Sequence, residues 1–339
     1  MELSDEVAKR LRADVFWLCT SRPFDTAQLT RAGIPHRALA SPRWRGFKGF
    51  LAPLARAILD AAREIRRFKP HVLVGVGGYG TVPPVLAAKA LGVPYVLLEQ
   101  NVRPGKANRF LAVGAHRIYV QWAEAKNAFP GRGSRVLVTG SPLRDTLRPV
   151  PRERALERFG LAPDLPTVAV VGGSQGAEAL NRGAVAGLDG TARKLQLIHV
   201  AGPQVDAVRR AYAEKGARAE VREFVQEMDL LYSAADLIVS RAGAMAIAEI
   251  AAFGVPAVLV PISRSAGDHQ RENARAVAKA GGAILMEEPD CLAGGLAPVL
   301  RKLVARDPVF EAMRRGLKPL ARAGAAEAIL ADLKGIMAR

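Results

Sequence analysis

The residues at 172–176, GGSQG, have the types and spacing of a phosphate-binding turn. They follow an unbroken run of apolar and β-branched residues, TVAVV at 167–171, which is typical of a strand buried on both faces. A helical pattern begins directly afterwards at Ala177. A strand, a glycine turn and a helix N-terminus together offer backbone N–H groups and a positive dipole to a phosphate. The hydroxyl of Ser174 could donate to a phosphate oxygen, or it could cap the helix of a turn that binds nothing.

Predicted strands and helices alternate along the whole chain. The apolar runs expected to be strands lie at 15–19, 71–76, 95–98, 117–120, 135–139, 167–171, 195–201, 219–223, 236–240, 257–260 and 283–286. We therefore expect an α/β fold with two doubly wound domains that face each other. The first covers residues 1–145 and the second residues 146–325. The helix expected at 326–339 could pack back on the first domain.

Length and cysteine content favour a cytosolic protein of two domains. A chain of 339 residues is long for one hydrophobic core. Its two cysteines, Cys19 and Cys291, lie far apart and no secretory signal precedes them, so reduced thiols are expected. The best candidate for a membrane span, 242–262, contains Glu249 together with internal Gly and Pro. That composition fits a helix, a turn and a strand better than a membrane-spanning helix.

The net charge of +17 is concentrated in the N-terminal part of the chain. Residues 1–150 hold 24 Lys and Arg against 10 Asp and Glu, whereas residues 151–339 hold 25 against 22. Such a positive field could attract an anionic membrane, a nucleic acid or a pyrophosphate substrate. No aromatic and basic platform for single strands and no recognition helix is evident, so a nucleic-acid binder is not expected.

The segment 43–69 combines basic and apolar side chains in two ways. Its residues Leu51, Leu54, Ile58, Ala62 and Ile65 have helical spacing, which is typical of an amphipathic helix packed on the core. A loop expected before this helix contains Arg43, Trp44, Arg45, Phe47, Lys48 and Phe50. This loop and the helix start could instead rest on an anionic bilayer. Both interpretations can hold for different faces of the helix.

Several sequence blocks occur in a fixed order along the chain. They are GGYGTVP at 77–83, EQN at 99–101, GGSQGAEALN at 172–181, SRAGAMAIAEIAAFGVPAVLVP at 240–261 and DHQRENA at 268–274. Together they resemble the MurG family of glycosyltransferases, from about Val15 to about Ala325. The resemblance implies a GT-B fold, in which two Rossmann-like domains flank a cleft, with no metal and no cofactor in catalysis. It also implies transfer of N-acetylglucosamine from UDP-N-acetylglucosamine to the undecaprenyl-linked acceptor lipid I, by a peripheral protein on the cytoplasmic face of the membrane.

The resemblance also assigns roles to individual residues. Those implied to contact the UDP-sugar are Asn101, Arg144, Ser174, Gln175, Val225, Ala244, Met245, Ala246, Ile247, Ala248, Glu249, Gln270 and Asn273. Those implied on the acceptor side are Gly77, Gly78, Tyr79 and Thr81. Glu249 would accept from the ribose hydroxyls, and the Arg144 guanidinium can grip a diphosphate or be a solvated linker residue. His269 is a weaker candidate for the sugar. The sequence assigns no general base, and Glu99 is the one carboxylate near the acceptor side that could act as one.

The sequence departs from the MurG pattern at two points. The first glycine loop of the family is absent, because Met1 aligns just after it, and the histidine that precedes EQN in the family is Leu98 here. Either translation starts further upstream, as we expect, or the chain cannot catalyse normally. A doubly wound domain without its first strand would have an empty central position in its sheet. A catalytically impaired UDP-sugar binder, a UDP-N-acetylglucosamine 2-epimerase and a lipid galactosyltransferase remain the alternatives.

Overall fold

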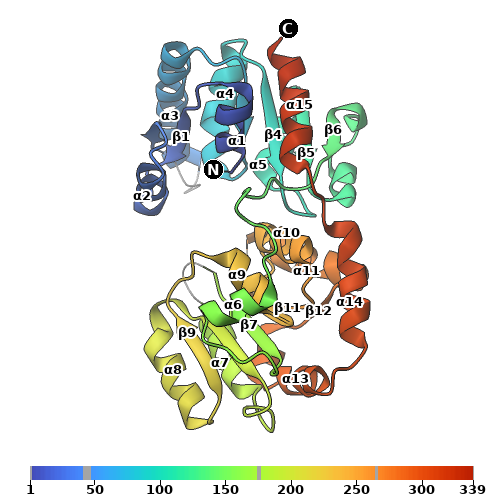
Figure 1. The fold of residues 1–339 in the computed structure, drawn as a ribbon. Coiled ribbons are helices and arrows are strands. Elements are labelled where there is room, and N and C mark those ends of the chain that lie inside the picture. The colour runs from blue at the N-terminus through green and yellow to red at the C-terminus, as the bar shows by residue number, and fades with distance from the viewer. Residues whose placement is uncertain (1, 41–46, 174–176, 264–265, 339) are drawn as a thin grey trace. The chain divides into compact units, whose positions relative to one another are not determined.

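The chain forms two compact α/β units, which Figure 1 shows as ribbons. The computed structural model describes residues 2–40, 47–173, 177–263 and 266–338. Unit 1 consists of Met1–Pro142 together with Gly324–Arg339, and unit 2 consists of Leu143–Ala323. None of the helices in these described ranges is both long enough and apolar enough to span a bilayer.

Unit 1 alternates helices and strands. Its elements are α1 (Glu2–Leu11), β1 (Trp17–Thr20), α2 (Pro23–Arg31), β2 (His36–Leu39), α3 (Phe47–Phe68), β3 (Leu73–Gly75), α4 (Val82–Ala90), β4 (Tyr95–Glu99), α5 (Lys106–Leu111), β5 (Arg117–Val120), β6 (Val136–Val138) and α15 (Ala325–Met337). The described strands pair in parallel as β1-β2 and as β3-β4-β5-β6. Leu18, Leu39 and Leu73 from the two groups share one apolar cluster with α3 and α4. No described strand pairs with the second edge of β1 or of β3.

The structure of the N-terminal half differs from the predictions in three respects. Strand β2 was not predicted, because within its sequence HRAL only Leu39 is buried and no apolar run marks it. Helix α3 already begins at Phe47, so Phe47, Lys48 and Phe50 belong to a helix and not to a loop. Leu51, expected in the core stripe, is 50% exposed. Arg43, Trp44 and Arg45 lie outside the described residues.

The C-terminal helix α15 packs on the sheet of unit 1. Its Ile329, Leu330 and Leu333 are buried against side chains of β4 and β5, and Figure 1 shows α15 (red) alongside both strands. Its Asp332 accepts a hydrogen bond from the Tyr119 hydroxyl at 2.8 Å. Burial and this carboxylate both raise the pKa of Tyr119. The end of the chain is therefore part of the core of its first unit.

Unit 2 contains one parallel sheet in its described part. Its elements are α6 (Arg152–Arg158), β7 (Thr167–Val171), α7 (Glu178–Ala186), β8 (Gln196–Val200), α8 (Val205–Glu214), β9 (Arg218–Arg222), α9 (Met228–Ala234), β10 (Leu237–Ser240), α10 (Ala244–Phe253), β11 (Ala257–Leu259), α11 (His269–Lys279), β12 (Ala283–Leu285), α12 (Glu288–Leu292), α13 (Leu296–Val304) and α14 (Val309–Leu317). The strands lie in the order β12-β11-β10-β7-β8-β9. Counted from β7, this is the dinucleotide-binding order 3-2-1-4-5-6, whose direction reverses between β7 and β10. The segment 242–262 forms α10, a turn and β11, as predicted.

Candidate functional site

The carboxyl edge of the unit 2 sheet collects most of the residues that the sequence assigns to the UDP-sugar. Val171 at the end of β7 pairs with Ser240 at the end of β10, so the loops after these strands start side by side. The loop after β9 contains Val225, which is buried, and the loop after β11 leads into α11. Open α/β sheets bind ligands outside the carboxyl ends of their strands, at the point where the strand order reverses.

The glycine turn follows β7 at this reversal point. Gly173 has a φ of 89°, a conformation that side chains other than glycine rarely adopt. Helix α7 begins at Glu178, directly after the turn. Ser174 and Gln175 lie outside the described residues, so their assignment to the phosphate and the sugar stays a prediction.

A buried polar network fixes the first turn of α7. Asn181 in α7 accepts a hydrogen bond from His199 Nε2 at its Oδ1, at 2.9 Å, and its amide nitrogen donates to Ala201 O at 3.0 Å. The other ring nitrogen of His199 lies 2.7 Å from the Tyr212 hydroxyl. Burial lowers the pKa of His199 to about 3, so its ring is neutral at physiological pH. This network holds the helix behind the glycine turn and was not identified from the sequence.

Helix α10 begins at the carboxyl end of the neighbouring strand, β10. Its first residues are Ala244, Met245 and Ala246, and its first turn closes with a bond from Ile247 N to Gly243 O at 3.0 Å. Ala248 and Glu249 follow in the second turn. The first N–H groups of a helix have no acceptor within it, so a helix start at this edge favours an anion.

Glu249, predicted to bind the ribose, is held by a tyrosine that the sequence did not indicate. The Tyr232 hydroxyl in α9 donates to Glu249 Oε2 at 2.8 Å. Burial, and then the charge of Glu249, raise the pKa of Tyr232 well above its ordinary value. The charge of Arg144 opposes this shift, so Arg144 lies within electrostatic reach of the same phenol. The structure thus joins Glu249 to Tyr232 by a hydrogen bond, and the charge of Arg144 acts on the same phenol.

The residues predicted to contact the sugar lie at the start of α11. Gln270 accepts a hydrogen bond from Ile262 N at 3.2 Å through its side-chain oxygen. Asn273 is fully buried and donates to Ala242 O at 3.3 Å, which links α11 to the turn before α10. His269 is the first residue of α11 and is half-buried.

The glycine turn of unit 1 follows β3. Gly77 and Gly78 have φ values of 89° and 75°, and the Thr81 hydroxyl donates to Gly77 O at 2.5 Å. The guanidinium of Arg22 lies 5.2 Å from the centre of the Tyr79 ring, a cation–π contact. The turn therefore has a defined shape, and its role toward the acceptor stays a prediction.

Glu99 is a buried anchor in this structure. Among the described residues, four donors reach its carboxylate: Asn101 N and Nδ2 at Oε1 (3.0 and 3.1 Å), and Gly105 N and Asn108 Nδ2 at Oε2 (both 2.9 Å). Its exposed fraction is 3%. A carboxylate has about four lone-pair sites, so these bonds engage all of them. This geometry supports a role in shaping the loop that carries Asn101 rather than a role as general base.

Asn108 is a residue of unit 1 that no sequence motif indicated. Its amide nitrogen donates both to Leu98 O and to Glu99, while its Oδ1 has no hydrogen-bond partner within the described ranges. Gly77 lies beside it, because a Cβ at Gly77 would come within 3.4 Å of Asn108 Nδ2. Leu98, which replaces the histidine of the MurG pattern, is buried in the apolar cluster beneath α15. Asn108 thus connects the EQN block to the glycine turn after β3.

The part of the chain that the structure describes contains no group of three or more His, Cys, Asp or Glu side chains that could hold a metal ion. That catalysis needs no metal and no cofactor stays a prediction.

Two Rossmann-like units in one chain define the GT-B class of glycosyltransferases. The structure of Acinetobacter baumannii MurG superposes with a TM-score of 0.80 at 27% identity and covers 98% of this chain and 94% of its own. The structure of the UDP-GlcNAc 2-epimerase from Neisseria meningitidis bound to UDP-GlcNAc has a TM-score of 0.68 at 15% identity, covering 98% of this chain and 95% of its own. At that identity the likeness to the epimerase concerns the fold alone.

The sequence comparisons define the family. The glycosyltransferase family 28 N-terminal domain matches residues 3–120, and the glycosyltransferase family 28 C-terminal domain matches residues 167–329. A relative from Stutzerimonas stutzeri, named "UDP-N-acetylglucosamine--N-acetylmuramyl-(pentapeptide) pyrophosphoryl-undecaprenol N-acetylglucosamine transferase", is 37% identical over 327 residues, which are 93% of this chain and 88% of the relative. The chain therefore belongs to glycosyltransferase family 28 and, within it, to the MurG family.

The anchoring role of Glu99 predicts the effect of Glu99→Gln. The side-chain NH2 of the amide would replace one carboxylate oxygen and face the N–H groups that now donate to it. Each buried polar group left without a partner costs about 1–3 kcal/mol. We expect a lower free energy of unfolding by that amount and faster hydrogen exchange of residues 100–108, measured by mass spectrometry. Glu124→Gln, at an exposed position of the same unit, is the control. Exchange of 100–108 that matches the wild type would contradict the anchoring role.

Proposed function

We propose that the chain transfers N-acetylglucosamine from UDP-N-acetylglucosamine to lipid I, which gives lipid II for peptidoglycan synthesis. Membership of the MurG family over both units is the observation that carries this proposal. It is supported by the reversal of strand order in unit 2, where the glycine turn after β7 and the start of α10 lie on neighbouring strands. A nucleoside diphosphate has the charge and the shape that such an edge accommodates.

The proposed contacts divide the UDP-sugar among separate elements. The diphosphate lies against the glycine turn and the start of α10, with Arg144 supplying a positive charge. The ribose hydroxyls donate to Glu249, which also accepts from the Tyr232 hydroxyl. The sugar lies toward α11, within reach of Gln270. Each ligand group meets a partner of matching chemistry. The diphosphate anion binds N–H groups and a guanidinium, and the hydroxyls of the ribose and the sugar bind a carboxylate or an amide.

The proposed reaction is an inverting single displacement. A base takes the proton from the 4-hydroxyl of the acceptor sugar, and the resulting oxygen attacks the anomeric carbon of N-acetylglucosamine. The bond from that carbon to the diphosphate breaks, and UDP leaves with the electron pair. Negative charge grows on the diphosphate as it leaves, so the fixed N–H groups and Arg144 stabilise the transition state more than the ground state. Glu99 positions the acceptor-side loop in this scheme.

We also propose that unit 1 rests on the cytoplasmic face of the membrane as a peripheral protein. Leu51 and Leu59 on α3 are 50% and 60% exposed. Leu59, Arg63 and Arg66 are spaced to lie on one side of the helix, and both arginines are exposed. An apolar strip beside basic side chains binds an anionic lipid surface. The lipid-linked acceptor would reach the protein at this surface.

The ribose contact predicts a selective kinetic effect of Glu249→Ala. A hydrogen bond to a charged group contributes about 1.5–3 kcal/mol, so the KM for UDP-N-acetylglucosamine should rise by roughly 10- to 100-fold. The KM for a lipid I analogue should change little. The measurement is transfer of labelled N-acetylglucosamine to that analogue, with Glu214→Ala at an exposed position of unit 2 as the control.

Other outcomes of the same assay would argue against the proposal. Equal rises in both KM values would reject the ribose role of Glu249. Binding of the UDP-sugar by wild-type protein without any transfer would support a catalytically impaired binder instead. Epimerisation of the sugar nucleotide in the absence of an acceptor would support an epimerase.

The membrane proposal predicts weaker vesicle binding when Arg43, Arg45 and Lys48 are all replaced by Gln. Each basic residue near an anionic surface contributes about 1 kcal/mol, so the three substitutions should weaken binding to phosphatidylserine vesicles by roughly a hundredfold. Sedimentation with vesicles at fixed ionic strength measures this. The control replaces three exposed basic residues of unit 2, Arg210, Arg301 and Lys302, by Gln. Equal losses in both triple variants would show that net charge, and not this segment, determines binding.

A further inference from the structure

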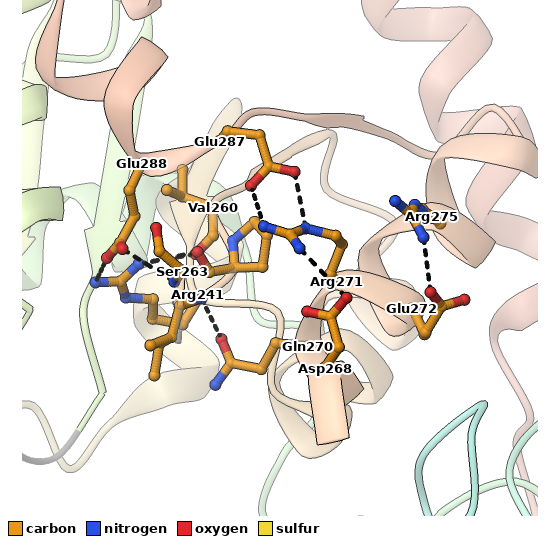
Figure 2. A network of polar contacts seen from close by, with 12 residues as sticks. Arg241, Val260, Ser263, Asp268, Gln270, Arg271, Glu272, Arg275, Glu287 and Glu288 are labelled. Atoms are coloured by element: carbon orange, nitrogen blue, oxygen red, sulfur yellow. Dashed lines mark hydrogen bonds and ion pairs between the residues drawn. The ribbon is translucent and has the colours of Figure 1, made fainter. Parts of the chain in front are cut away.

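The loop that follows β11 is held residue by residue by side chains from other elements. Figure 2 shows this network. Arg241 reaches the carbonyl oxygens of Val260 and Pro261, Gln270 accepts from Ile262 N, and Glu288 accepts from Ser263 N. Four successive residues therefore have a backbone polar group bound to a side chain. Loops are ordinarily the mobile parts of a fold, whereas this one is held by side chains that lie outside it.

Arg241 is the centre of this arrangement. It follows β10 directly, and its side chain is only 13% exposed. Its Nη1 donates to Val260 O at 3.1 Å and to Pro261 O at 3.4 Å, and its Nη2 lies 2.6 Å from Glu288 Oε1. The planar guanidinium can hold two carbonyls and a carboxylate at once, which a lysine ammonium cannot do in the same geometry.

Glu288, at the start of α12, completes the pair. Its Oε2 accepts from Ser263 N at 3.0 Å, and its side chain is 17% exposed. Burial works to raise the pKa of Glu288, but the hydrogen bond from Ser263 and the charge of Arg241 outweigh it, so its pKa is lowered. The carboxylate is thus charged at neutral pH and bound on both oxygens.

The same loop leads into α11, which is fixed by separate contacts. Arg271 forms a two-pronged ion pair with Glu287, with both N–O distances at 2.9 Å, and Asn273 donates to Ala242 O next to Arg241. The ion pair of Arg275 with Glu272 lies on the same helix, away from Val260 and Ser263 (Figure 2). The turn before α10 and the start of α11 are therefore linked through Arg241 and its neighbours.

We propose that Arg241 and Glu288 are positioning residues that hold the loop 260–263, and with it the start of α11, in register with the turn before α10. This inference rests on the proposed function, in which α10 binds the ribose and α11 reads the sugar. The pair contacts no substrate atom in this scheme. The pair sets the distance between the starts of α10 and α11, which bind different parts of the UDP-sugar. Loss of the pair should therefore weaken binding of the sugar and leave binding of the nucleotide unchanged.

Glu288→Gln tests this role without removing side-chain volume. Arg241 and Ser263 N bind different oxygens of the carboxylate, and the amide replaces one of these oxygens by an NH2 group, so one of the two donors would face another donor. Calorimetric titration should show the Kd for UDP-N-acetylglucosamine rising about fivefold or more, within the range of coupling measured between contacting residues. The Kd for UDP alone should change by less than about twofold, because the ribose and diphosphate contacts remain. Glu272→Gln, which breaks the neighbouring pair on α11, should change neither Kd.

Arg241→Lys and the double variant extend the test. If Arg241 and Glu288 act as one unit, the double variant should raise the Kd for UDP-N-acetylglucosamine no more than the larger single effect. A loss of folded protein lowers the binding stoichiometry and leaves both Kd values unchanged, so it is distinguished from a positioning effect. Unchanged Kd values for both ligands in folded variants, or equal rises for both, would overturn the inference. Wild-type protein that binds neither UDP nor the UDP-sugar would overturn the proposed function itself.

Discussion

The reversal of strand order between β7 and β10 is the constraint on which the candidate site depends. From β7 the chain continues to β8 and β9 on one side, and it returns to form β10 on the other. Crossovers between parallel strands are almost always right-handed, so the helices that follow β7 and β10 leave toward opposite faces of the sheet. The two loops separate at that point, and the N-terminal ends of α7 and α10 border the space between them. Among the described strands of this sheet, β7 and β10 are the neighbours at which the strand order reverses.

Polar side chains with little exposure stabilise loops in both units. Asn181 and His199 hold the start of α7, Arg241 and Glu288 hold the loop after β11, and Glu99 holds the loop after β4. A buried polar group is costly when it lacks a partner, and each of these forms specific bonds to backbone or side chain. Their positions are therefore strictly determined, and so are the loops to which they bind. A site that must orient both a nucleotide and a sugar benefits from such fixed loops.

Much of this architecture could be predicted from the sequence. The strand from Thr167 to Val171 was predicted to its last residue, because Pro166 precedes the apolar run and two glycines follow it, and these residues mark both ends of the strand. Strand β2 could not be predicted, because three of its four residues are not buried and no apolar run marks it. The strand forms because its backbone pairs with β1, a contact that the local sequence does not reveal. The fold class depended on the long apolar runs, which a parallel sheet requires.

The candidate site was predictable only in part. Glu249 was noticed because it is a carboxylate within an apolar helix, but its partner Tyr232 lies on another helix and has no motif. The pairing of Arg241 with Glu288 joins residues that are distant in sequence, so only the folded chain reveals it. Glu99 was taken for a possible base because a carboxylate at a strand end often is reactive, whereas its buried bonds to Asn101, Gly105 and Asn108 support an anchoring role. Contacts of this kind follow from tertiary structure and leave no local signal.

The central claim is that unit 2 binds a uridine diphosphate at the edge where β7 and β10 end. A crystal structure of the chain with UDP tests this most directly. The account predicts the diphosphate beside the glycine turn and the first turn of α10, with both ribose hydroxyls within about 2.6–3.2 Å of the Glu249 carboxylate. Electron density for UDP elsewhere on the molecule, or a ribose turned away from Glu249, would contradict it.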